Sequence, residues 1–236
     1  MAPRTNIVPR PGATIYRANV AVNMREYFQG HWNVGTYEGV DCAQMRRVGA
    51  DGDGGKVVCW EAVPAPSEPC FVLSVGVGGD PGAPPDFSFE RDLHRRLPHC
   101  TIDVYDGTNF GRGAITNAPK YVNFFPQNFQ PTTWQKYKGR RVDIFKIDCE
   151  GCEFESIPPF IDNVHTEQLL FEIHGAGRRQ QVEQLMRSLN KTLGIYYREP
   201  NIQYSDGTCI EFALRRRRKA SPVQTPASSP SRSRRA

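Results

Sequence analysis

The sequence predicts an α/β protein with a Rossmann-like, doubly wound and mostly parallel sheet and a closing antiparallel strand. Three observations lead to this prediction. From residue 70 onward, short apolar runs alternate with helix-like stretches, the pattern of βαβ units. A glycine loop, Gly76–Gly79, follows the first of these runs. Acidic residues end the later runs, most notably Asp148 after residues 142–147. Because ligands of open α/β sheets bind beyond the carboxyl ends of the strands, charge at this edge indicates a nucleotide-like cofactor.

The N-terminal part precedes this alternation and is rich in turn residues. Residues 18–30 predict a short helix with apolar side chains on one side. A glycine-rich turn at residues 49–56 leads into a strand-like run at residues 57–60. Prolines from Pro64 to Pro69 then separate this part from the main fold.

The main fold contains seven predicted strands, which cover residues 71–75, 101–105, 121–125, 142–147, 168–173, 195–198 and 208–214. Helices are predicted over residues 88–97 and 178–193. A shorter helix begins at Glu153 and is expected to stop before Pro158, because proline interrupts the hydrogen bonds of a helix.

The net charge of +5 belongs to the end of the chain. Residues 215–236 hold eight basic residues and no acidic one, so subtracting their +8 leaves residues 1–214 with a charge of −3. A basic folded surface for nucleic acid is therefore not indicated, and nucleic acid would be contacted through the tail only. We expect an N-terminal extension over residues 1–41, a main domain over residues 42–214, and a basic, disordered tail over residues 215–236.

The seven cysteines are an odd number, and the N-terminus has no apolar run typical of a secretory signal. We therefore expect free, mostly buried thiols and an intracellular location, cytoplasmic or nuclear. Cys149 and Cys152 form a CxxC sequence, which raises metal or redox chemistry as a less favoured alternative because no second pair has suitable spacing. No apolar run approaches the ~20 residues of a membrane-spanning helix.

Cofactor binding is predicted at two strand ends. Gly76, Gly78 and Gly79, followed by Asp80, would let the backbone approach a ligand closely. Asp106 ends the second strand of the main fold, where a carboxylate can accept two hydrogen bonds from the hydroxyls of a ribose. The alternatives are an ordinary tight turn for the glycines and a solvated loop position for the aspartate.

Catalytic groups are predicted at two further strand ends. Asp148 and Glu150 are close enough to repel, so the pKa of one should rise and prepare it for proton transfer. Alternatively, they would hold a divalent cation through oxygen ligands, or Glu150 would serve the dipole of the following helix. Glu172 and His174 close the next strand on one face, and His174 is a candidate base or ligand.

These residues resemble a known family, the eukaryotic methyltransferase-like domain related to FkbM-type O-methyltransferases of the class I S-adenosylmethionine-dependent fold. The resemblance covers residues 42–214, and its most specific part is the Lys-Ile-Asp-x-Glu-Gly-x-Glu sequence at residues 146–153. Other matching segments are residues 47–49, 53–59, 74–80, 88–93, 104–106, 168–174 and 199–202. One departure is Ser74, which stands where many class I methyltransferases carry an acidic residue.

The resemblance implies S-adenosylmethionine as methyl donor and a small-molecule or glycan acceptor, most simply a sugar hydroxyl. It implies that Gly76, Gly78 and Gly79 face the amino-acid end of the cofactor and that Asp106 holds its ribose. Asp148 would orient or deprotonate the acceptor. The alternatives are an RNA 2′-O-methyltransferase, whose site usually combines two lysines with Asp and Glu, a non-catalytic module that retains the fold, and a dinucleotide-dependent oxidoreductase.

Overall fold

The computed structural model describes residues 39–51, 54–78, 84–108, 118–174, 178–201 and 209–218. The helix predicted over residues 18–30, the cofactor candidates Gly79 and Asp80, and the tail from residue 219 lie outside the described residues. Within the described part, no helix is long and apolar enough to cross a membrane.

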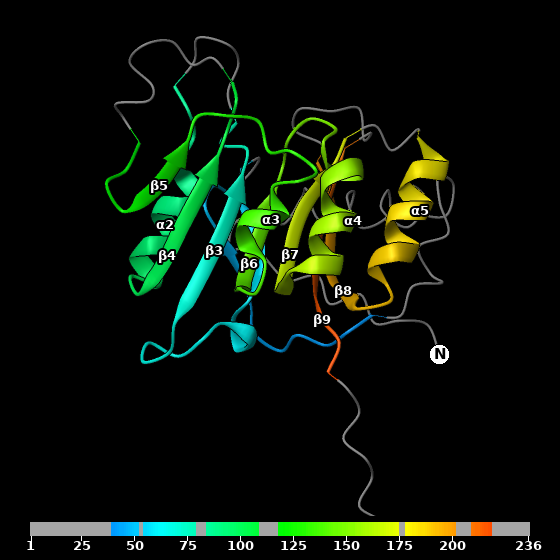
Figure 1. Cartoon of the computed structure of the whole chain (residues 1–236). Helices are drawn as coiled ribbons and strands as arrows, with labels where there is room; N and C mark the ends of the chain where they lie inside the picture. The colour runs from blue at the N-terminus through cyan, green and yellow to red at the C-terminus, as the bar shows by residue number, and fades with distance from the viewer. Residues whose placement is uncertain are drawn as a thin grey trace, which may run out of the picture.

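A seven-stranded sheet forms the centre of the molecule (Figure 1). Five strands run parallel, and the last two pair antiparallel at one side. This architecture confirms the predicted fold class. In spatial order the strands are β5 (Val122–Phe125), β4 (Cys100–Tyr105), β3 (Cys70–Val75), β6 (Arg141–Ile147), β7 (His165–Ile173), β9 (Ile210–Arg216) and β8 (Leu193–Pro200).

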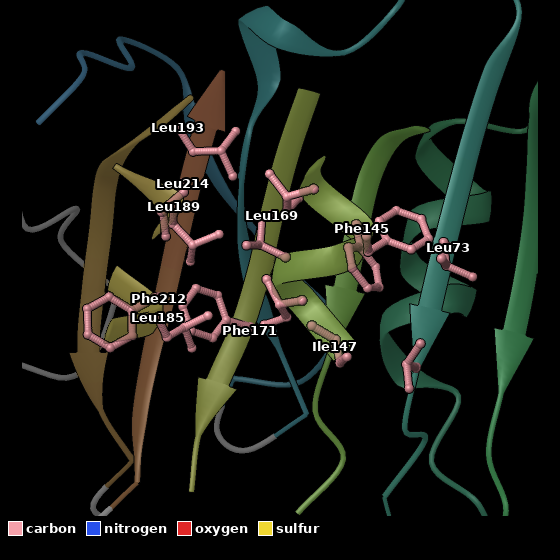
Figure 2. Close-up of a cluster of buried hydrophobic side chains, with 14 of the residues drawn as sticks. Leu73, Phe145, Ile147, Leu169, Phe171, Leu185, Leu189, Leu193, Phe212 and Leu214 are labelled. Atoms are coloured by element: carbon pink, nitrogen blue, oxygen red, sulfur yellow. The ribbon is translucent and has the colours of Figure 1, made fainter. Parts of the chain in front are cut away.

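Helices cover both faces of the sheet, as alternation along the strands requires. Helix α2 (Ser88–Arg96) lies behind the sheet in Figure 1, whereas α3 (Trp134–Tyr137), α4 (Glu153–Asn163) and α5 (Arg179–Leu189) lie in front of it. Leu73 packs with the cluster on the α4 and α5 face, and its neighbour Val72 packs with the cluster on the α2 face. Figure 2 shows side chains of the first cluster, with Leu185 and Leu189 of α5 opposite Leu169 and Phe171 of β7.

A separate two-stranded sheet precedes the main sheet. Strands β1 (Met45–Val48) and β2 (Lys56–Cys59) pair antiparallel, and a short 3₁₀ helix, η2 (Trp60–Ala62), follows. The Cys59 N–H donates to Oε1 of Gln168 on β7 at 2.8 Å. The small sheet therefore lies against the main one, and the strand predicted over residues 57–60 is one half of a hairpin.

Helix α4 continues through Pro158 and Pro159 to Asn163, so the predicted stop before Pro158 is wrong. A proline inside a helix costs about 3 kcal/mol. Here Ile157, Phe160 and Ile161 are buried in the main apolar cluster. Because each such side chain contributes about 1.5–3 kcal/mol on burial, packing outweighs the lost hydrogen bonds.

The last strand extends two residues beyond its predicted end at residue 214. Strand β9 continues to Arg216, and Arg215 is only 9% exposed, where it forms an ion pair with Glu61. The N–H of Arg217 donates to the carbonyl of Thr192 at 3.0 Å. The first arginines of the basic run thus belong to the fold. A count of charges cannot tell such folded arginines from those of a disordered tail.

The prediction of free thiols is also wrong. Disulfides join Cys42 to Cys59, Cys70 to Cys100, and Cys149 to Cys152, which leaves only Cys209 outside these pairs. Residues 70 and 100 begin the adjacent strands β3 and β4 and are partners in the register. Their Cα atoms are 4.4 Å apart, within the range that a disulfide can span. The pairing depends on this register, which the spacing of the cysteines in the sequence does not reveal.

Candidate active site

The carboxyl ends of the central strands place the two main candidate aspartates on the same edge of the sheet. Val75 of β3 is in register with Tyr105 of β4 on one side and with Ile147 of β6 on the other. Asp106 and Asp148 directly follow these two partners. The two carboxylates therefore flank the end of β3, as the parallel sheet predicted by the sequence requires.

Gly76 fits where the chain passes closely over the end of β6. Its φ is +79°, and a Cβ at this position would lie 1.7 Å from the carbonyl oxygen of Asp148. The N–H of Gly76 donates to the Tyr105 carbonyl at 2.8 Å, and that of Asp148 donates to the Val75 carbonyl at 3.0 Å. Among the described residues, a Cβ on Gly78, which has a φ of +62°, would meet nothing within 4 Å. In the described part of the loop, Gly76 therefore packs tightly against the end of β6, whereas Gly78 has space beside it.

Asp106 is 8% exposed and binds the backbone of two loops. Its Oδ2 accepts a hydrogen bond from the Val77 N–H at 2.8 Å, and its Oδ1 accepts one from the Thr108 N–H at 2.7 Å. A carboxylate has about four lone-pair positions, so these two bonds leave acceptor capacity for a ligand. Asp106 also fixes the residue after Gly76, which couples the loop to the end of β4.

An acidic side chain reaches the strand before the glycine loop from a helix. The Ser74 hydroxyl donates to Oε1 of Glu90 on α2 at 2.5 Å, and both residues are fully buried. Burial raises the pKa of Glu90, against the opposing effect of Lys146 and Ser74. Lys146 on β6 donates to the carbonyl of Gly76. Ser74 therefore has a carboxyl partner although the strand itself lacks one.

Asp148 lies between two cationic side chains. Its Oδ2 accepts a hydrogen bond from Lys56 Nζ at 2.8 Å, and its Oδ1 lies 3.6 Å from His174 Nε2. Burial opposes ionisation, but the charges of Lys56 and Lys146 outweigh this effect and lower the pKa of Asp148 to about 2. Repulsion between Asp148 and Glu150 was expected to raise one of their pKa values. For Asp148 that expectation is wrong, because the neighbouring cations dominate.

His174 is surrounded by carboxylates. Its Nδ1 lies 3.1 Å from Oε1 of Glu153, and its Nε2 lies 3.5 Å from Glu150 and 4.0 Å from Glu172. Burial favours the neutral ring, but the hydrogen bond to Glu153 and the surrounding negative charges raise the pKa of His174 to about 9. Near neutral pH the ring is therefore an imidazolium. In that form it cannot accept a proton, which a general base must do.

Glu150 is held in the loop between β6 and α4. Its φ is +58° and that of Gly151 is +116°; the left-handed conformation is unusual for a residue with a side chain. The disulfide between Cys149 and Cys152 closes the loop, and the Cys149 N–H donates to Oε1 of Glu153 at 2.9 Å. Because the Glu150 side chain is 86% exposed, it lies at the outer side of the group formed by Asp148 and His174.

Sequence reasoning missed two charged residues of this site. Lys56 begins β2, although the sequence predicted it at the end of a glycine-rich turn, and its Nζ also donates to Oε1 of Glu211 at 2.5 Å. Burial raises the pKa of Glu211 to about 8, with Lys56 opposing the rise. The one available signal was Glu211 itself, an acidic residue inside the apolar run 208–214. Its connection to Lys56 required tertiary structure.

Two groups of side chains around Asp148 bring ligand atoms within 4.8 Å of one another, as a metal ion needs. One combines Asp148 with Glu153 and His174, and the other combines it with Glu172 and Glu211. The ammonium of Lys56 already binds two carboxylates of the second group. In the first group, the raised pKa of His174 favours the protonated ring, which cannot ligate a metal. In this arrangement the carboxylates are paired with Lys56 and His174, which disfavours the binding of a divalent ion.

The chain matches a family described as a methyltransferase domain, over residues 18–127 and 127–215. Because the match spans most of the chain, the protein belongs to this family. The family match and the fold together define a class I S-adenosylmethionine-dependent methyltransferase. A comparison with curated proteins finds no match.

Several solved structures are similar to this chain at low sequence identity. The fibrillarin/Nop5p complex gives 11% identity and a TM-score of 0.46 over 65% of this chain and 74% of that one. The Methanococcus jannaschii fibrillarin pre-rRNA processing protein gives 9% and 0.46, over 77% and 86%. The N-methyltransferase NodS from Bradyrhizobium japonicum WM9 gives 16% and 0.41, over 62% and 85%.

Proposed function

We propose that this enzyme methylates a hydroxyl group of a sugar or another small acceptor. The observation that carries the proposal is the position of Asp148. The backbone of Asp148 lies beside Gly76 of the glycine loop, and its carboxylate has Oδ2 bonded to Lys56 and Oδ1 facing His174. A fixed carboxylate at this point can accept a hydrogen bond from an acceptor hydroxyl and orient its oxygen, and correct positioning can contribute about 7–11 kcal/mol to catalysis.

The cofactor would be held by the loop after β3 and the end of β4. Gly78 has open space at its Cβ position, and Asp106 retains acceptor capacity after its two backbone bonds. We propose that Gly76 and Gly78 face the amino-acid end of the cofactor and that Asp106 binds the ribose. Gly79 and Asp80, outside the described residues, are proposed to complete the loop.

S-adenosylmethionine supplies a methyl group bound to a positively charged sulfur, so the acceptor must provide an oxygen that loses its proton. Asp148 is ionised near neutral pH, as its lowered pKa requires, and can accept the hydrogen bond of that hydroxyl. We assign Glu150 and His174 supporting roles, with the imidazolium holding Asp148 from the side opposite Lys56. The hydroxyl proton would pass to the Asp148 carboxylate, and such general base assistance typically contributes about 10²–10⁴-fold.

A finer relationship, to FkbM-type O-methyltransferases and their eukaryotic relatives, is proposed on the sequence at residues 146–153. In the structure this stretch ends β6 and opens α4. Its three carboxylates, those of Asp148, Glu150 and Glu153, all lie within 3.6 Å of His174. The proposal therefore rests on a stretch whose acidic residues share one partner.

Calorimetry with S-adenosylmethionine, followed by transfer of an isotopically labelled methyl group to a panel of acceptors, tests the function. We expect saturable cofactor binding and labelling of a sugar or small hydroxyl compound, with the same rate in the presence of a chelator. Labelling confined to amines or RNA would contradict the proposed acceptor. Absence of cofactor binding would instead favour the non-catalytic alternative.

RNA 2′-O-methylation is the second candidate. Lys56 bonds both Asp148 and Glu211, and Lys146 also lowers the pKa of Asp148, so two lysines act near an Asp and a Glu. Lys146, however, donates to the Gly76 carbonyl. RNA binding by the full chain and by a chain ending at Arg218, over a range of salt concentrations, distinguishes the candidates. Strong salt-dependent binding by the shorter chain would favour RNA, whereas binding only by the full chain would assign it to the tail.

The three disulfides favour an oxidising compartment over the predicted intracellular location, because such bonds persist mainly outside the reducing cytosol. We propose that the protein folds in such a compartment.

We also propose that its catalytic domain begins near residue 42 and ends with β9 at Arg216. Limited proteolysis, read by mass spectrometry, checks both ends of that domain.

A further inference from the structure

Lys56 carries a charge into the interior of the protein. Its side chain is 2% exposed, and its Nζ lies 2.8 Å from Asp148 Oδ2 and 2.5 Å from Glu211 Oε1. The residue begins β2, which belongs to the small N-terminal sheet and not to the sheet that carries the two acids. A buried charge is expensive unless it is paired, so this arrangement needs both carboxylates.

The surroundings of Lys56 contain more acids than one lysine neutralises. Carboxylate oxygens of Asp148, Glu172 and Glu211 lie within 4.8 Å of one another. Lys56 bonds two of them, and Oε2 of Glu211 is buried without a hydrogen-bond partner among the described residues. Removing the ammonium would therefore leave three neighbouring acidic side chains without the cation that they share.

The hairpin that carries Lys56 is fixed at several points. Gly55 comes so close to the Ala50 carbonyl that a Cβ would lie 1.9 Å from it. The Tyr196 hydroxyl donates to the carbonyl of Val57 at 2.8 Å, and the Cys59 disulfide and its bond to Gln168 hold the end of β2. A lysine on such a support can hold its partner in one orientation.

We propose that Lys56 is a positioning residue for methyl transfer, which holds Asp148 ionised by binding Oδ2 and leaves Oδ1 toward His174 and the acceptor. The inference rests on the proposed role of Asp148 and makes the N-terminal hairpin a part of the active site. Burial of Asp148 opposes its charged form, and Lys56 is the strongest of the groups that favour it. The charged groups that act on Asp148 or bound its cluster come from five elements and their ends: Lys56, Lys146, Glu153, Glu172, His174 and Glu211.

The test is a pH titration of Asp148 in protein labelled with ¹³C at the aspartate carboxyl groups. Its signal is assigned from its loss in Asp148→Asn, and Lys56→Met is compared with wild type. In wild type we expect Asp148 to stay ionised well below the ordinary aspartate pKa of about 3.9. In Lys56→Met its midpoint should rise by about 1–3 pH units, and the acidic limb of the transfer rate should move upward with it.

Three further variants complete the experiment. Lys191→Met removes an exposed lysine and should titrate like wild type, and Lys56→Arg should restore the low midpoint. Because Lys56→Met leaves buried acids unpaired, the double variant Lys56→Met/Glu211→Gln also removes the second acid that Lys56 binds, and it provides a second reading should the single variant not fold.

Three results would overturn the proposal: an ordinary Asp148 midpoint in wild type, an unchanged midpoint without Lys56, or a rate lowered by one factor at every pH. The carboxyl titration requires neither cofactor nor acceptor. A failure of cofactor binding or methyl transfer in wild type would therefore contradict the proposed function separately from the role of Lys56.

Discussion

Asp148 Oδ1 lies 3.6 Å from His174 Nε2, across the ends of the neighbouring parallel strands β6 and β7. The two residues carry opposite charges near neutral pH, since the pKa of Asp148 is lowered to about 2 and that of His174 is raised to about 9. The pair therefore acts as a fixed carboxylate beside a fixed cation. This assignment of charges determines which substitutions should affect turnover and which should affect stability.

Asp148→Asn should stop turnover and leave cofactor binding nearly intact. The amide keeps the shape of the side chain but loses the negative charge that orients the acceptor, so we expect the rate to fall by about 10²–10⁴-fold. Methyl transfer and calorimetric affinity for S-adenosylmethionine are measured together. Glu155→Gln, on the exposed side of the adjoining helix α4, is the matched control and should behave as wild type. A comparable rate in Asp148→Asn would remove this residue from the mechanism.

Gly76→Ala should be far more damaging than Gly139→Ala, although both glycines have a φ of +79°. The shared conformation costs an alanine about 1–2 kcal/mol. At Gly139 the Cβ would meet nothing within 4 Å, whereas at Gly76 it would lie 1.7 Å from the Asp148 carbonyl oxygen. Thermal unfolding and cofactor affinity should show an additional loss of about 1–3 kcal/mol in Gly76→Ala. Equal losses in the two variants would mean that the chain does not pass β6 so closely.

His174→Gln should change how stability depends on pH. The pKa of His174 is about 9 in the folded protein, against an ordinary 6.5. Its stabilisation is thus complete below pH 6.5 and is lost as pH rises through 9. Denaturant unfolding should show wild type more stable than the variant by at most about 3 kcal/mol at low pH, with the difference shrinking over that window. A difference that stays constant would show that His174 is not charged in the folded state.

Alkylation of the unfolded, unreduced protein should modify one cysteine only, Cys209, because the other six are paired. Peptide mapping should identify the same three pairs. Loss of the bond between Cys42 and Cys59 through a double serine variant should lower stability by about 3 kcal/mol, the value for a loop of similar length. Labelling of all seven cysteines in protein isolated without reductant would contradict both the pairing and the proposed compartment.

The sequence was sufficient for the architecture because the signals for the main sheet are local. Apolar runs, the glycine loop and acidic strand ends each arise from a few adjacent residues, and parallel connections then bring Asp106 and Asp148 to one edge. The predicted length of helix α4 was too short because the cost of Pro158 could be read from the sequence, whereas the burial of Phe160 could not.

The charge state of the site could not be predicted for a related reason. Asp148 and Glu150 are close in sequence, so the local pattern indicated repulsion between them, a shared cation or the dipole of the following helix, but no partner from a distant segment. Lys56 reaches Asp148 from a separate sheet, and Glu211 reaches Lys56 from the last strand. Such contacts depend on how the hairpin packs against β7 and β9.

A crystal structure with S-adenosylhomocysteine would test the central claim most directly. The account predicts that the ligand lies across the end of β3, with its ribose hydroxyls at Asp106, its amino-acid end at Gly76 and Gly78, and its sulfur facing Asp148. A ligand bound away from this edge, or one whose sulfur is separated from Asp148 by the sheet, would contradict the assignment of the active site.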